Sequence, residues 1–213
     1  MKPALLALVS LVALAGLAPP AQAHPHVWIT AKAEIVYAAD GNVSGVRHHW
    51  TFDAGYSAYL TQGLDKNGDG KLTPDELQEV AKENAESLVD FEYFTVLKVN
   101  GAKQGFEAPR EYGMTFENGL AELWLFLPAA SPAKGKTVVL EVYDSTFFVS
   151  FNLADGEDAV RLAGAPQGCT ATVSRPKPAA ADQQKLSEAF FGALTAASNY
   201  GSNFANRAII ACP

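Results

Sequence analysis

The chain has 213 residues, of which 48% are hydrophobic and 18% are charged, and its formal net charge is −7 at pH 7. This acidic balance argues against nucleic acid and anionic membrane surfaces as partners, because both are negatively charged. The length is enough for one good hydrophobic core.

Residues 1–23 have the features of a secretory signal peptide. Lys2 supplies a positive charge, Ala4 to Ala18 form an apolar run, and Ala21-Gln22-Ala23 is typical of a cleavage site. The run of about fifteen residues is short of the ~20 that a membrane span needs, and no later segment is apolar enough to cross a bilayer. We therefore expect a periplasmic protein whose mature chain is a single domain, residues 24–213, without a transmembrane segment.

Cleavage after Ala23 would place two histidines at the start of the mature chain, in the sequence His24-Pro25-His26. A terminal histidine offers both its α-amine and its imidazole to one ion. His26 adds a third nitrogen, and such a set suits copper, zinc or nickel. The alternative is that both histidines are exposed on a frayed end and bind no ion.

The next two segments predict a β-hairpin. Apolar and polar residues alternate from Val27 to Tyr37 and again from Val43 to Asp53, and Asp40-Gly41 between them predicts a type I′ turn. A two-residue turn would place Glu34 opposite Arg47, so that an acid faces a base in the expected register.

This register limits which side chains can join the histidine end. His49 would lie too far along the strand from His26 to share an ion, whereas Asp53 would lie opposite Trp28 and is nearer. Asp53 is therefore a candidate ligand, and it also suits the N-cap of a following helix. His48 points to the apolar face, where a histidine is more often part of the core than a metal ligand.

Residues 65–76, Asp-Lys-Asn-Gly-Asp-Gly-Lys-Leu-Thr-Pro-Asp-Glu, match a calcium-binding EF-hand loop. Side-chain oxygens fall at loop positions 1, 3, 5, 9 and 12, a backbone carbonyl serves at position 7, and glycine stands at position 6, where the chain turns sharply. The alternative is a surface turn that binds no ion. The predicted calcium ligands are Asp65, Asn67, Asp69, Lys71, Thr73 and Glu76.

The residues around this loop predict two helices. A short entering helix is expected over residues 53–64, and the exiting helix is expected to begin at Pro74 with a capping box formed by Thr73 and Glu76. Residues 53–92 would then form an EF-hand-like helical insertion. Because the sequence contains one such unit rather than a pair, we expect calcium to be a structural clip rather than a sensor.

The remaining residues are mostly rich in strand-forming side chains, with a tight hairpin predicted at Asn118-Gly119. An amphipathic helix is expected over Asp182 to Ala197. The fold class that we predict is α+β: mainly antiparallel β-sheet or sandwich, with the EF-hand-like insertion and a C-terminal helix. The predicted strands are Phe94–Val99, Glu111–Phe116, Ala121–Leu127, Thr137–Tyr143, Phe147–Leu153 and Phe204–Ala211.

The chain contains two cysteines, Cys169 and Cys212. In an oxidising compartment an isolated pair is most simply a structural disulfide. A redox or metal-binding role is disfavoured because the spacing is wide and no Cys-x-x-Cys motif is present.

Five short marks occur in order along the chain. They are His24-Pro25-His26, His48-x-Trp50-x-Phe52-Asp53, the loop of residues 65–76, Tyr93-Phe94, and Tyr143-Asp144-x-x-Phe147-Phe148. With them the chain resembles a domain-of-unknown-function family of exported bacterial proteins, often labelled the periplasmic component of an uncharacterised ABC-type transport system. The resemblance implies an association with nickel, cobalt or zinc transport, and it includes His48 among the marks.

The predicted function is that of a periplasmic metal-binding accessory protein that supports a membrane metal transporter. Calcium would stabilise it, and nickel, cobalt, zinc or copper would bind at His24 and His26, with Asp53 and His48 as further candidate ligands. One alternative is a calcium-clipped structural or interaction module, and another is a copper-dependent oxidative enzyme. We predict no enzymatic activity, because the sequence shows no nucleophile–base arrangement and no phosphate loop.

Overall fold

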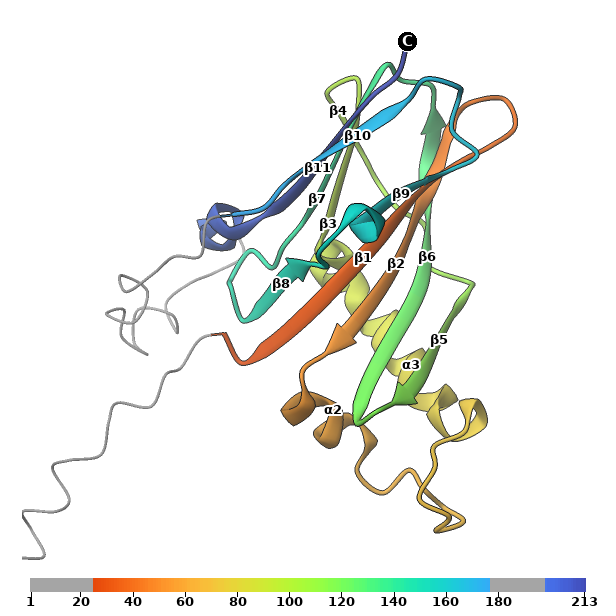
Figure 1. Ribbon diagram of the computed structural model, residues 1–213, viewed down its shortest axis with the longest axis vertical. Helices are drawn as coiled ribbons and strands as arrows, with labels where there is room; N and C mark the ends of the chain where they lie inside the picture. The colour runs from red at the N-terminus through yellow and green to blue at the C-terminus, as the bar shows by residue number, and fades with distance from the viewer. Residues whose placement is uncertain (1–24, 177–197) are drawn as a thin grey trace, which may run out of the picture.

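The computed structural model of the chain describes residues 25–176 and 198–213. Two β-sheets enclose a common hydrophobic core, and two α-helices lie at one end of the larger sheet (Figure 1). The predicted signal peptide, His24 and the predicted helix Asp182–Ala197 lie outside the described residues. No helix in the described ranges is long and apolar enough to cross a membrane.

The larger sheet, sheet A, has the strand order β5-β6-β2-β1-β8, and β9 also pairs with β1. Sheet B has the order β10-β11-β7-β3-β4. The strands of sheet A are β1 (Val27–Tyr37), β2 (Val43–Phe52), β5 (Tyr112–Glu117), β6 (Leu120–Ala133), β8 (Val149–Leu153) and β9 (Val160–Ala163). Those of sheet B are β3 (Thr95–Val99), β4 (Ala102–Gln104), β7 (Thr137–Val142), β10 (Thr170–Ser174) and β11 (Asn206–Ala211).

The pairing of β1 with β2 follows the predicted register. Glu34 lies opposite Arg47, and 2.5 Å separates Arg47 Nη1 from Glu34 Oε2. The turn differs from the prediction, because Asp40 is not in the left-handed region that a type I′ turn requires. Only Gly41 has positive φ there, and the register shifts between Val36 and Tyr37. The tight hairpin at Asn118-Gly119 is confirmed, with φ of 52° and 80° at its two central residues.

The second neighbour of β1 was not predicted. The edge of β1 that does not face β2 pairs in parallel with β8 and then with β9, whereas all other named pairs are antiparallel. Parallel neighbours need a long crossover, which here consists of everything from β2 to β7. No local pattern in the sequence signals such a pairing.

The helices are α2 (Ala54–Thr61) and α3 (Pro74–Ser87), and a 3₁₀ segment, η1, covers Leu88–Phe94. Shorter 3₁₀ turns cover Glu157–Ala159 and Tyr200–Phe204. The fully buried Ser57 ties α2 to sheet A: its hydroxyl donates to the Phe52 carbonyl at 3.2 Å and accepts the Ala121 N–H at 3.0 Å. On α3, Leu77, Ala81 and Ala85 are buried, and the helix lies against β5.

The predicted α+β class is wrong. Strands make up 45% of the described residues and helices of all kinds make up 23%, so the protein is mostly β. The helix–loop–helix of an EF-hand is not shown. Helix α2 ends at Thr61, and residues 62–64 separate it from Asp65, so no helix leads directly into the loop. After Ser87 the predicted exiting helix gives way to η1, and within η1 residues 92 and 93 adopt left-handed backbone angles.

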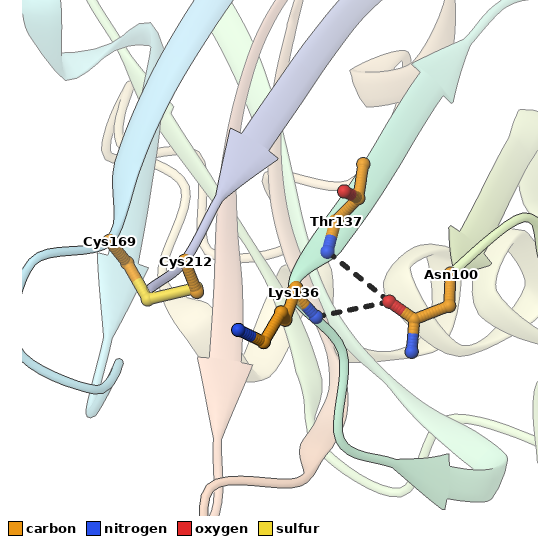
Figure 2. The surroundings of a disulfide bond; sticks show 5 residues. All are labelled: Asn100, Lys136, Thr137, Cys169 and Cys212. Atoms are coloured by element: carbon orange, nitrogen blue, oxygen red, sulfur yellow. Dashed lines mark hydrogen bonds between the residues drawn. A yellow bond between two sulfur atoms is a disulfide. The ribbon is translucent and has the colours of Figure 1, made fainter.

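The disulfide between Cys169 and Cys212 is confirmed and joins the start of β10 to the end of β11 (Figure 2). The Cys212 N–H donates to the Lys136 carbonyl at 2.8 Å, which holds the same end of β11 to β7. Beside it, the Asn100 side-chain oxygen accepts the N–H groups of Lys136 and Thr137 at 3.0 and 3.3 Å (Figure 2). Covalent and hydrogen bonds therefore secure this end of sheet B.

Replacing both cysteines by serine should lower the free energy of unfolding by about 4 kcal/mol, the chain-entropy value for a loop of this length. Urea unfolding of the oxidised protein and of the Cys169→Ser/Cys212→Ser variant measures the difference. Reduced wild-type protein is the control and should unfold like the variant. Equal stability of all three samples would contradict a stabilising bond.

Candidate functional site

Asp53 joins three elements through both oxygens of its carboxylate. Oδ1 accepts the Tyr56 N–H and Oδ2 accepts the Trp28 N–H, each at 3.0 Å, and the Asp53 N–H donates to the Trp28 carbonyl at 2.9 Å. Burial raises the pKa of Asp53, but the backbone amides together outweigh it and hold the pKa below its usual value. The predicted N-cap role is confirmed. A metal ion at Asp53 would have to share each carboxylate oxygen with a backbone amide.

His26 is fixed at the start of β1 by its contact with Phe148. The His26 N–H donates to the Phe148 carbonyl at 2.9 Å, and the two rings stack with centroids 4.6 Å apart. Within residues 25–176 and 198–213, no three histidine, cysteine or acidic side chains come together as a metal-binding group.

His48 lies in the core, fully buried, as its place on the strand indicated. Its Nε2 is 3.0 Å from the Thr95 hydroxyl, which itself donates to the Tyr93 carbonyl at 2.7 Å. Because that hydroxyl has one hydrogen, His48 Nε2 must be the donor, and Nδ1 is left as a lone pair. His48 pairs with Ala33 of β1, which lies roughly 20 Å along the strand from His26. The structure therefore does not bring the two histidines together.

The loop of residues 65–76 is organised by its own carboxylates. Asp65 accepts the N–H groups of Gly68 at 2.7 Å and Gly70 at 2.9 Å, and both glycines have positive φ. Glu76 accepts the N–H of Lys66 at 3.1 Å and of Thr73 at 3.0 Å, so the last predicted ligand folds back toward the first. The Thr73 amide and hydroxyl and the Lys66 amide hold the pKa of Glu76 below its usual value. The predicted capping box is confirmed.

A pocket of about 470 Å³ lies at the end of the molecule where α2 and α3 are found, and sequence reasoning did not find it. Its floor is the inner face of sheet A, and its cover consists of the end of α3, η1 and the segment before β8. The lining is mostly aromatic and aliphatic, and among the described residues Asp144 is its single charged side chain. The lining residues from sheet A are Val27, Trp50, Phe52, Leu123 and Val149, and those from the cover include Leu88, Phe91, Phe94 and Phe148.

The backbone around this pocket is strained. Glu92, Tyr93 and Phe94 are three consecutive non-glycine residues in the left-handed region, with φ of 49°, 53° and 50°, and Phe147 follows the same pattern at 62°. Each such residue costs roughly 1–2 kcal/mol. Strain of this kind persists where the surroundings enforce it, and it is concentrated at functional sites.

Two buried polar atoms beside the strained segment have no hydrogen-bond partner among the described residues. They are His48 Nδ1 and Trp50 Nε1, on side chains that are 0% and 1% exposed. An unsatisfied buried group costs about 1–3 kcal/mol. One residue of each aromatic mark, Phe94 and Phe148, lines the pocket together with Trp50. The sequence shows the two marks, but it does not show that they lie close together in the folded protein.

These features define a two-sheet β protein with an aromatic pocket at one end and an acidic glycine-rich loop beside it. The chain belongs to the family described as "Protein of unknown function (DUF1007)", whose family model matches residues 9–212. It is also similar to a protein of Spirochaeta aurantia described as "Uncharacterized 15.5 kDa protein in trpE 3'region". The two are 28% identical over 115 residues, which cover 53% of this chain and 81% of that protein.

Burial makes the stability contribution of His48 depend on pH. Loss of solvation, with a smaller repulsion from His49, lowers the pKa of His48 from 6.5 to about 3. Between these values the unfolded chain binds a proton that the folded protein does not, so stability falls as the pH falls from 6.5 toward 3.

Wild-type protein should therefore lose about 2 kcal/mol more unfolding free energy than His48→Gln between about pH 7.5 and about pH 5. Urea unfolding at the two pH values measures both losses. The glutamine amide keeps a donor for Thr95 but has no proton to gain. Identical acid sensitivity in the two proteins would mean that His48 is not held neutral.

Proposed function

We propose that the protein is a metal-binding accessory protein of the periplasm that supports a membrane metal transporter, as the periplasmic component of an ABC-type system. In this proposal calcium stabilises the loop of residues 65–76, and nickel, cobalt, zinc or copper binds at the mature N-terminus. The observation that carries the proposal is the arrangement of carboxylates and amides in the loop.

The internal hydrogen bonds of the loop favour a calcium ion over a plain surface turn. Asp65, at position 1, gathers the amides of positions 4 to 6, and Glu76, at position 12, accepts the amide of position 2. The chain is thereby closed on itself with its first and last carboxylates directed inward. Calcium takes six to eight oxygen ligands from such a loop, including a bidentate glutamate at position 12. Gly70 supplies the positive φ of 77° that the turn at position 6 needs.

If calcium binds there, a hundredfold excess over the Kd should stabilise the protein by about 2.7 kcal/mol and raise its Tm by roughly 5–10 °C. Thermal unfolding with calcium and with a chelator measures the shift. Glu76→Gln keeps the helix cap and should remove most of the shift, whereas Asp75→Asn, at a position that supplies no ligand, should retain it. An equal Tm with calcium and with chelator would remove the calcium part of the proposal.

For the transition metal we propose a site at the terminal residues alone. Among the described residues Asp53 belongs to no group of three histidine, cysteine or acidic side chains, and His48 is enclosed in the core away from His26. The proposed chelate therefore consists of the α-amine and imidazole of His24 and the imidazole of His26. Three nitrogens of this kind suit copper, nickel or zinc.

Protein cleaved before His24 should bind copper, zinc or nickel at least about tenfold more tightly than protein with one additional N-terminal residue, because the addition removes one chelating nitrogen. Competition against a chromophoric chelator measures the affinities. His26→Ala should weaken binding as well, and His49→Ala is the matched control that should not. Unchanged affinity after blocking the amine, together with a positive calcium result, would favour the calcium-clipped interaction module instead.

A further inference from the structure

Asp144 is a buried carboxylate without a counter-ion among the described residues. It is 4% exposed and lines the aromatic pocket. Oδ1 accepts the Thr146 N–H at 2.8 Å and the Thr146 hydroxyl at 2.9 Å, and Oδ2 accepts the Val149 N–H at 2.9 Å. No lysine, arginine or histidine of the described ranges forms an ion pair with it. Buried charges are normally paired, so the negative charge calls for a positive partner.

The position of Asp144 is fixed by close packing from behind. Gly201 lies so near that a Cβ there would be 1.6 Å from the Asp144 carbonyl oxygen, and the Gly201 N–H donates to the Ser145 carbonyl at 2.9 Å. Phe147, in its left-handed conformation, packs on Phe204 with ring centroids 4.3 Å apart. The carboxylate therefore belongs to a rigid wall of the pocket.

The rest of the lining is suited to a cation and unsuited to an anion. Among the described residues, six aromatic side chains contribute to it and no lysine, arginine or histidine does. The faces of aromatic rings carry partial negative charge and attract ammonium groups. The six are Trp50, Phe52, Tyr56, Phe91, Phe94 and Phe148.

Two of these aromatic side chains are exposed at the rim. Phe91 is 58% exposed and Phe148 is 46% exposed, and Phe91 stacks on Phe94 with centroids 5.3 Å apart. Phe94 in turn contacts Trp50 with centroids 6.3 Å apart, so these three rings lead from solvent to the core. The volume of about 470 Å³ is in the range of small-molecule sites and exceeds what a single ammonium group fills.

We propose that this pocket binds an organic cation, a molecule whose quaternary or bulky ammonium group lies against the aromatic rings beside Asp144. A metal ion is a poor fit, because a single carboxylate with both oxygens already hydrogen-bonded offers too few ligands. An anionic ligand would meet Asp144 without any compensating base. This site is separate from the proposed calcium loop. Its rim residue Phe148 stacks on His26, so the Asp144 and Phe91 variants are the ones that test it independently of the terminal histidines.

The test compares a cation with an uncharged molecule of the same shape. Isothermal titration calorimetry of the disulfide-bonded mature protein with choline, with the larger benzyltrimethylammonium and with 3,3-dimethylbutan-1-ol gives the three affinities. Saturable binding of at least one cation is expected, with the neutral alcohol at least about tenfold weaker than choline if choline binds. Equal or tighter binding of the alcohol, or no saturable binding of either cation, would overturn the proposal.

Variants locate the site. Asp144→Asn should weaken cation binding by about tenfold and leave binding of the alcohol unchanged. If that variant does not fold, the rim variants Phe91→Leu and Phe148→Leu test the location of the site. Each should weaken cation binding about two- to fivefold. Trp28→Leu is the matched control: Trp28 is similarly exposed at 48%, but it lies on the outer face of sheet A. An equal loss in the control, or none at the rim, would place binding elsewhere.

Discussion

The position of β2 between β1 and β6 is the constraint on which the remaining structure depends. Its inner face carries Val46, His48, Trp50 and Phe52, all buried, and its outer face carries Arg47, which pairs with Glu34. A shift by one residue would exchange the two faces and bury the charged side chains. With the register fixed, Asp53 follows at the end of the strand, where it can cap α2 and hold β1 at once. The floor of the pocket and the start of the helical segment are consequences of this pairing.

Stability and site geometry oppose each other at the pocket. The left-handed residues 92–94 and the unsatisfied nitrogens of His48 and Trp50 reduce stability, and they are connected, because His48 reaches the Tyr93 carbonyl through Thr95. The opposite end of sheet B, by contrast, combines a disulfide with satisfied hydrogen bonds. Left-handed residues and unsatisfied nitrogens thus accumulate beside the pocket, although among the described residues the buried Tyr37 hydroxyl, at the other end of β1, is unsatisfied as well. Such accumulation is what a protein with a binding site at this end is expected to show.

Local sequence patterns predicted what local physics determines. Alternation gave the register of β1 with β2, Asn118-Gly119 gave a tight hairpin because both residues tolerate positive φ, and the Thr73–Glu76 capping box gave the start of α3. The α+β prediction is wrong because the EF-hand motif predicts a full helix on each side of the loop. Helix α2 is short, and α3 ends at Ser87, from where a 3₁₀ segment leads to the left-handed residues 92–94.

The candidate site was less predictable than the fold. Asp53 was correctly placed beside Trp28, but its two oxygens could be assigned to amides only from coordinates. The pocket unites β1, β2, β6, η1 and the segment before β8, and no spacing along the chain reveals that meeting. Asp144 stands in the sequence as part of a short aromatic mark, and its Oδ1 accepts the Thr146 amide. Its burial among aromatic rings follows from tertiary packing alone.

The parallel pairing of β1 with β8 and β9 has a consequence for how the chain folds. The β1–β2 hairpin can form early because its contacts are local, but the other edge of β1 must wait about 120 residues for its partner. Until then an apolar strand presents unpaired amides and carbonyls, which is the usual starting point for wrong strand pairing between chains. We therefore expect the arrival of Val149–Ala163 to limit folding, and slow or truncated synthesis to leave β1 as the segment most exposed to aggregation.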